Sequence, residues 1–313
     1  MNFFRAYRRI RVLIGFFPLA HVGTGGFSIR MLNLQTLKID PFTEHLASGY
    51  EATFGTLHPE YVDFLRMASS LSLENIANGD MLYHNVDHSI MVTMVGLEII
   101  RGKHLYEGRV SAEDGLNYLL ALLCHDIGYV KGACERDEGD HFEVGEDELL
   151  ELSDSGTCAI LTPHHVSRGK IFVRERFKSY DFLDLDLVSA CIERTRFPVP
   201  DKDAYQNTTD LPGLARAADF IGQLGDPEYL RKIPALYYEF EELGANKQLG
   251  CETPGDLRRG YARFFWDVAH QYLGHAVRLL RMTQEGKTWV SRLHSHVFVC
   301  EHFLVNADKN KSE

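Results

Sequence analysis

Histidines and carboxylates gather in the first two thirds of this chain in a pattern that suits a metal centre. The chain has 15 histidines, and seven of them fall between residues 84 and 165. Neutral imidazole and carboxylate groups are ordinary ligands for zinc, iron, manganese and nickel. A divalent ion would supply hydrolytic chemistry, because it lowers the pKa of a bound water and acts as a Lewis acid. The histidine-rich segment is therefore the strongest candidate for a functional site.

The segment Tyr-His-Asn-Val-Asp-His at residues 83–88 places His84 and His88 four residues apart. On a helix, residues four apart project from one face, so this spacing predicts that both rings point into one pocket. Two exposed or capping histidines at the start of a helix would have the same spacing. The pair alone therefore leaves both interpretations open.

Two further sites place carboxylates in apolar or small-residue surroundings. His125 and Asp126 directly follow the apolar run 119–124. Asp219 lies within residues 214–220, a segment of mainly small and apolar side chains. A buried charge without a partner is costly, and a metal ion compensates it well. Asp219 is either a metal ligand or a buried hydrogen-bond acceptor, and the histidines upstream favour a ligand.

Taken in order, these residues resemble a known family. The defining motif of the HD-domain metal-dependent phosphohydrolases is similar to a set of residues found here between positions 83 and 219. This set consists of His88, the pair His125-Asp126, and Asp219. The opening Tyr-His-Asn-x-x-His resembles the cyclic-nucleotide phosphodiesterase branch in particular. The resemblance implies an HD-type multi-helix bundle around a central metal site.

Three more histidines resemble the extra ligands of the HD-GYP cyclic-dinucleotide phosphodiesterases. His141 begins the sequence His-Phe-Glu-Val-Gly, and His164 and His165 are adjacent. The Gly-Tyr-Pro signature of that group is absent, because the pair is followed by Val-Ser-Arg-Gly-Lys at residues 166–170. Tyr129 also stands where many relatives carry another polar residue.

Carried over residue by residue, the resemblance implies a role for each position. His84 would be the general acid. Asp126 would bridge to a second ion, whose other ligands would be His141, His164 and His165. The cofactor would be one or two divalent ions, drawn from Mn, Fe, Zn, Ni and Mg. The first ion would be held by His88, His125, Asp126 and Asp219.

The chemistry that follows is hydrolysis of a phosphate ester by metal-activated water. Lys131, Arg168 and Lys170 lie just after ligand positions and are candidates to bind the phosphate. Solvated surface charges would fit the same three positions equally well. The expected substrate is a small phosphate ester of the nucleotide class, specifically a nucleotide or cyclic-nucleotide phosphodiester. An enzyme of the phosphoric ester hydrolase class is expected.

Two other functions fit the same residues. A nucleotide phosphomonoesterase would use the same metal site with a different pocket. A ligand-sensing or scaffold module would keep the helical fold and the metal ligands without turnover. Metal analysis separates the sensor from the enzymes, and diester and monoester substrates separate the two enzymes.

The elements that must position these residues are helices. From residue 57 onward the apolar spacing has a helical period, and alternating strand patterns are scarce. Ser111 followed by Asp114 predicts a capped helix start before the apolar run. The sequence therefore predicts an all-α fold. Further helices are expected at 142–152, 183–194, 213–224, 227–243, 256–283 and 289–305.

Composition and charge exclude several classes of protein. The 313 residues are 45% hydrophobic and 25% charged, as in ordinary globular chains, and the net charge is −11. That acidity argues against an extended nucleic-acid partner. No apolar stretch is long enough for a transmembrane helix, and the six cysteines have no CxxC spacing. Reduced thiols and a cytoplasmic location are expected.

Three segments are expected along the chain. Residues 1–40 form an N-terminal extension whose arginines and apolar run resemble a targeting peptide. A misassigned start, with translation beginning at Met31, would explain this extension equally well. Residues 41–283 form the HD-type phosphohydrolase domain, and residues 284–313 form a C-terminal helix and polar tail.

Overall fold

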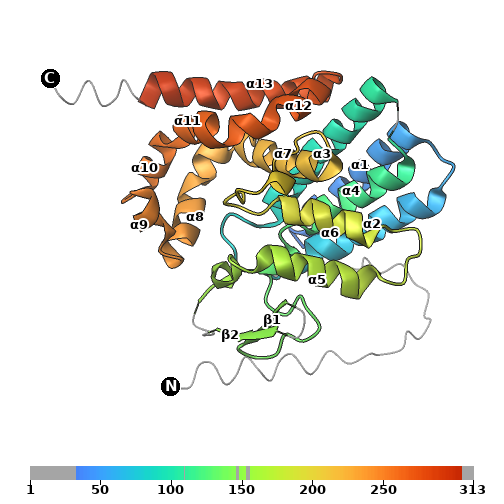
Figure 1. The fold of residues 1–313 in the computed structure, drawn as a ribbon, viewed down its shortest axis with the longest axis horizontal. Helices are drawn as coiled ribbons and strands as arrows, with labels where there is room; N and C mark the ends of the chain where they lie inside the picture. Colours follow the sequence, from blue (N-terminus) through green and yellow to red (C-terminus); the bar gives the residue numbers. More distant parts are fainter. Residues whose placement is uncertain (1–32, 109, 146–147, 153–155, 305–313) are drawn as a thin grey trace, which may run out of the picture. The chain divides into compact units, whose positions relative to one another are not determined.

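The computed structural model describes residues 33–304 apart from 109, 146–147 and 153–155, and within them the protein is all-α (Figure 1). The predicted fold class is therefore confirmed. The N-terminal extension before residue 33, with its apolar run, lies outside the described residues. The helices are α1 (Thr36–Phe54), α2 (Pro59–Ile76), α3 (Val86–Glu107), α4 (Ala112–Cys124), α5 (His165–Phe177), α6 (Leu185–Arg194), α7 (Leu211–Leu224), α8 (Tyr229–Glu242), α9 (Ala245–Leu249), α10 (Pro254–Arg259), α11 (Tyr261–Phe264), α12 (His270–Leu280) and α13 (Gln284–Val299).

Helices α3 and α7 form the centre of the bundle and pack closely against each other (Figure 1). The approach depends on Gly222, because a Cβ there would lie 2.7 Å from the Cα of Val92. Helix α4 contacts both α3 and α7, and α12 covers another side of the same pair. This arrangement brings α3, α4 and α7, the three helices that carry or precede the candidate ligands, to one place.

Side-chain caps set where helices α3 and α4 begin. The Asn85 side chain accepts a hydrogen bond of 3.0 Å from the Asp87 N–H and so starts α3 at Val86. The Ser111 hydroxyl accepts one of 2.9 Å from the Asp114 N–H and starts α4. The predicted helix start at Ser111 is confirmed.

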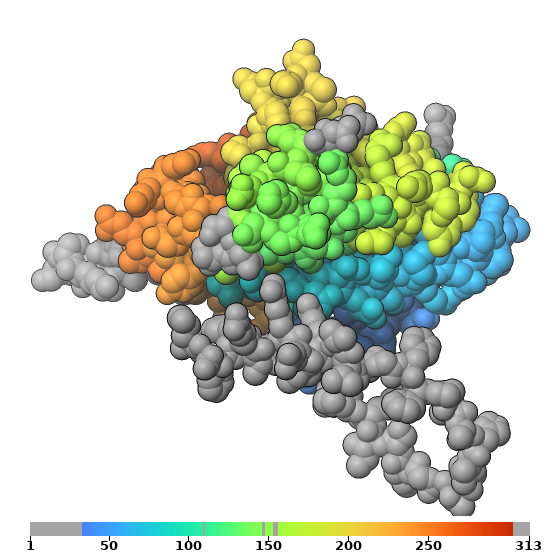
Figure 2. Space-filling model, turned by 90° about the horizontal axis from the view of Figure 1, so that it is seen from below, coloured from blue at the N-terminus to red at the C-terminus, as the bar shows by residue number. Residues whose placement is uncertain are grey.

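The helix expected at 142–152 is wrong, since this segment is a β-hairpin. Strand β1 (His141–Gly145) pairs antiparallel with β2 (Glu148–Glu151), with Phe142 opposite Leu150. Phe142 and Val144 are buried, and aromatic and β-branched residues favour the pleated backbone. Figure 2 shows this green segment at the surface between the orange C-terminal helices and the yellow-green α5.

The remaining predicted helices are present with shifted bounds. The expected helix 256–283 is divided into α10, α11 and α12, with a wider π-helical turn at residues 265–269. Helix α13 begins at Gln284 and packs on α3, α7 and α12, so it is part of the same compact unit as the rest of residues 34–304. Among the described helices, none is long and apolar enough to cross a membrane.

Candidate metal centre

Four side chains from three parts of the sequence converge at the end of α4. His88 comes from the first turn of α3, His125 and Asp126 follow the last turn of α4, and Asp219 comes from α7. His88 Nε2 lies 3.3 Å from Asp126 Oδ2 and 3.4 Å from Asp219 Oδ1. His125 Nε2 lies 3.4 Å from His88 Nε2 and 3.2 Å from Asp126 Oδ2. The structure therefore brings these four candidate ligands together.

The spacing of these atoms suits a common metal ion. Ligands placed about 2.1 Å from one ion in tetrahedral geometry lie about 3.4 Å from one another. Five of the six separations among the four donor atoms run from 3.2 to 3.8 Å. Two imidazole nitrogens and two carboxylate oxygens are a donor set for zinc, iron or manganese. The residues therefore fit a divalent transition metal.

Unsatisfied polar groups support the same interpretation. The side chains of His88, His125 and Asp126 are 3%, 1% and 5% exposed, and only Asp219, at 21%, reaches solvent. Asp126 Oδ2 is buried and has no hydrogen-bond partner of good geometry among the described residues. A buried carboxylate oxygen without a donor is costly, and an ion would satisfy it.

The tautomer of His125 is set for coordination through Nε2. Its Nδ1–H donates a hydrogen bond of 2.7 Å to the Leu122 carbonyl, which leaves the Nε2 lone pair facing the other ligands. The turn that follows is held close to α5, because a Cβ on Gly128 would lie 1.9 Å from the His165 carbonyl oxygen. Backbone packing thus fixes the His125-Asp126 turn.

Without an ion, the carboxylates beside them raise the pKa values of both His88 and His125. Burial alone would lower the pKa of His88, but contacts with Asp126 and Asp219 outweigh it and raise that pKa to about 10. Burial would raise the pKa of Asp126, yet His125 and His88 hold it well below its usual range. Metal binding would therefore release protons from the site.

His84 lies near the centre, but not on the helix face that the sequence predicts for it. The expectation that His84 and His88 share a helix face is wrong, because α3 begins at Val86 and His84 precedes its cap. A ring nitrogen of His84 nevertheless lies within 4.8 Å of the ligand atoms of His88 and Asp126. His84 is therefore adjacent to the candidate metal centre.

Glu239 on α8 holds His84 in this position. The Nδ1–H of His84 donates to Glu239 Oε2 at 2.6 Å. Glu239 Oε1 accepts from the backbone N–H groups of Tyr83 and His84 at 2.6 and 3.2 Å. This carboxylate is 4% exposed, so its hydrogen bonds form away from bulk water.

Glu239 is a candidate functional residue that the sequence analysis missed. It lies in the acidic stretch Tyr-Glu-Phe-Glu-Glu at residues 238–242, which reads as a solvated helix face. The helical spacing of α8 distinguishes Glu239 from the other glutamates of the stretch, because it lies three residues after the buried Leu236. Ile233 and Tyr237 on the same helix are also buried. A glutamate in register with buried apolar residues indicates an internal partner.

The three histidines expected to complete a second metal site do not join this group. Among the described residues, the clusters able to hold an ion contain none of them. His141 is exposed on β1, and His164 precedes α5 as its partly buried N-cap residue. His165 donates from Nδ1 to the Thr162 carbonyl at 2.5 Å and stacks on Tyr129, with ring centroids 4.3 Å apart.

The three cations expected to bind phosphate have partners within the chain. Arg168 is fully buried, pairs with Asp137 at 2.7 Å and donates hydrogen bonds to three backbone carbonyls. Its role is therefore structural, and the expectation that it binds substrate is corrected. Lys170 pairs with Glu193 at 2.5 Å. Lys131 donates to the Gly156 carbonyl at 2.8 Å.

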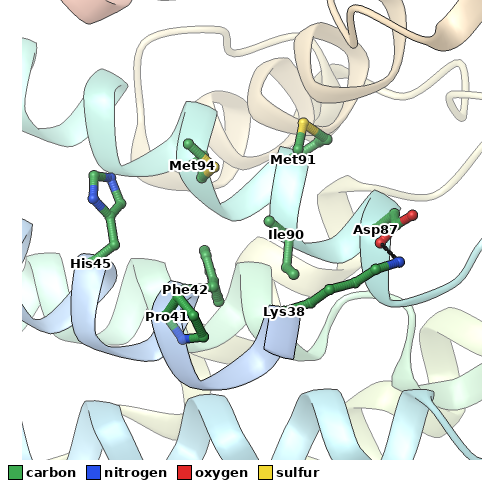
Figure 3. A pocket seen from close by; sticks show the side chains of 8 residues that line it. All are labelled: Lys38, Pro41, Phe42, His45, Asp87, Ile90, Met91 and Met94. Atoms are coloured by element: carbon green, nitrogen blue, oxygen red, sulfur yellow. Dashed lines mark hydrogen bonds and ion pairs between the residues drawn. The ribbon is translucent and has the colours of Figure 1, made fainter. Parts of the chain in front are cut away.

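A separate apolar pocket of about 350 Å³ lies between α1 and α3 (Figure 3). Lys38 and Asp87 form an ion pair of 2.8 Å at one end, and His45 lies at the other. Phe42 and Met94 are among the apolar side chains between them. The pocket contains none of the four candidate ligands and is distinct from the metal centre.

The comparison with protein families gives a match over most of the chain. A family model described as Npun_R2479-like matches residues 32–303, which is most of the chain. No curated protein matches the chain, and no solved structure does.

Proposed function

The chain belongs to the Npun_R2479-like family, and we propose that it is a divalent-metal-dependent phosphohydrolase acting on a nucleotide or cyclic-nucleotide phosphodiester. One observation carries the proposal: the donor atoms of His88, His125, Asp126 and Asp219 converge beside the His84–Glu239 pair. The resemblance of the same residues to the HD-domain phosphohydrolases supports it.

The four ligands supply the place where a divalent ion would act. When bound, such an ion supplies Lewis acidity and makes water a nucleophile near neutral pH. Asp219 and His84 are the most exposed members of the site, with side chains 21% and 17% exposed. A substrate would therefore approach from the side of these two residues.

His84 and Glu239 would act together as the proton donor. Because Glu239 accepts the Nδ1 proton, the other ring nitrogen, Nε2, is the one that carries a transferable proton in the imidazolium form. An ester oxygen needs that proton to leave as an alcohol. The carboxylate also orients the ring, so the pair combines positioning with proton donation.

The charge of the site favours a diester over a monoester. The carboxylates of Asp126 and Asp219 together offset the two positive charges of one divalent ion. Lys131, Arg168 and Lys170, which would otherwise add positive charge, are bonded within the chain. A singly charged phosphodiester therefore enters this site at a lower electrostatic cost than a doubly charged monoester.

The direct test compares two chromogenic substrates. Purified protein loaded with Mn²⁺ should hydrolyse bis-p-nitrophenyl phosphate faster than p-nitrophenyl phosphate, and Asp126→Ala should abolish both activities. Faster turnover of the monoester would indicate a nucleotide phosphomonoesterase instead. Metal binding without turnover of either ester, or of a panel of nucleotides and cyclic nucleotides, would indicate a ligand-sensing module.

A further inference from the structure

A two-ion centre requires more ligands than the four at the end of α4. Two ions that share a substrate lie about 3.5–4 Å apart, and the second needs its own side chains in addition to a bridging carboxylate. The sequence offers His141, His164 and His165 for that role. Where these three side chains lie decides how many ions the proposed metal centre could hold.

The first two of these histidines lie away from the centre. His141 is exposed at the edge of the hairpin, where its backbone pairs with Glu138 and Glu151. His164 is influenced electrostatically by Glu148, Arg168 and Arg196, none of which is a candidate ligand. Neither side chain belongs to a group that could hold an ion in the described part of the chain.

The third histidine, His165, stacks on an aromatic ring and belongs to no group of described residues that could hold an ion. The ring of Tyr129 stacks on His165 at 4.3 Å and 8°, and also stacks on His84 at 5.0 Å and 24°. Tyr129 is 4% exposed, so its ring fills protein interior beside the metal centre. Burial raises the pKa of its phenol well above the usual range, so the side chain stays neutral and is a poor replacement for a charged ligand.

We infer that the centre retains a single divalent ion, bound by His88, His125, Asp126 and Asp219, and that Tyr129 occupies the space that a second ion and its ligands would need. His165 supports Tyr129 by stacking and has no direct role in holding the ion.

Metal counting tests this inference independently of activity. The full chain is stripped with chelator, loaded with excess Mn²⁺ and passed through a desalting column, and the retained metal is measured by mass spectrometry. One ion per chain is expected for the wild type and for His141→Ala, His164→Ala and His165→Ala. The electron paramagnetic resonance spectrum should be that of isolated Mn²⁺, without exchange coupling between two ions.

The controls separate this inference from the proposed function. His125→Ala should retain almost no metal, and circular dichroism checks that each variant is folded. Two retained ions in the wild type, falling to one in His165→Ala, would overturn the single-ion inference and leave the proposed hydrolase intact. A wild-type chain that retains no Mn²⁺ or Zn²⁺ would contradict both.

Discussion

The carboxylate of Glu239 holds the imidazole of His84 through a hydrogen bond of 2.6 Å, although 155 residues separate the two in the chain. The same carboxylate accepts hydrogen bonds from the backbone of residues 83 and 84. It therefore fixes both the ring and the turn that carries it. Helix α8 takes part in the site in this way without offering a direct metal ligand.

The first prediction separates proton donation from metal binding. His84→Asn should keep the metal and lose about 10²–10⁴-fold in activity on an ester with an alkoxide leaving group. On a p-nitrophenyl ester the loss should be much smaller, because that leaving group is stable without a proton. His88→Asn should reduce metal content and both activities together. Equal losses on both substrates with depleted metal in His84→Asn would make His84 a ligand.

The second prediction concerns Glu239 as a positioning residue. Glu239→Gln keeps an oxygen for the backbone N–H groups but faces His84 with an amide, which favours the opposite tautomer. We expect a loss of at least about tenfold in kcat on the alkoxide ester, a much smaller loss on the p-nitrophenyl ester and unchanged metal content. Tyr238→Phe, at an exposed position of α8, is the matched control. Equal losses on the two esters would assign Glu239 a structural role only.

The third prediction concerns stability and the ion. An ion bound to the folded state alone stabilises it by about 2.7 kcal/mol at a hundredfold excess over Kd. Chelator should therefore lower the Tm of the wild type by several degrees and leave the Tm of Asp126→Ala almost unchanged. Asp63→Ala, a change at an exposed carboxylate, should behave like the wild type. A chelator effect of the same size in Asp126→Ala would place the ion elsewhere.

The fourth prediction concerns pH and Glu193. Burial would raise the pKa of this carboxyl, but hydrogen bonds from Arg196, Lys170 and Tyr205 lower it from 4.5 to about 2. Since the folded-state pKa is depressed, the stabilisation is present above pH 4.5 and is lost as the pH falls toward 2. Glu193→Gln should cost about 0.5–1 kcal/mol in urea unfolding at pH 7. The difference from wild type should shrink at pH 3, and a constant difference would contradict this account.

The fifth prediction concerns the close packing of the His125-Asp126 turn on α5. Gly128→Ala would place a Cβ 1.9 Å from the His165 carbonyl oxygen and 2.7 Å from the Gly169 nitrogen. Because both contacts are to backbone, we expect a loss of about 1–3 kcal/mol or more in the free energy of unfolding. Gly274→Ala on α12 meets nothing within 4 Å and should be neutral or stabilising. Equal stability of the two variants in urea would contradict the packing argument.

Local patterns in the sequence were sufficient for the helical class and for the ligand types. The apolar period identified most helices, and Ser111 marked the start of α4 because a cap depends on residues three apart. His125, Asp126 and Asp219 were recognisable because charged groups next to apolar or small residues need a partner. These inferences depend on neighbours in the chain, which a sequence displays directly.

Tertiary structure decided the features that depend on distant partners. The segment 142–152 forms a hairpin whose first strand buries the side chains of Phe142 and Val144. Arg168 has a structural role because Asp137 and three backbone carbonyls surround its guanidinium. The pairing of His84 with Glu239 required α8 to pack beside the start of α3. Hydrogen bonds and burial between segments far apart leave little trace in local spacing, so only the folded chain revealed them.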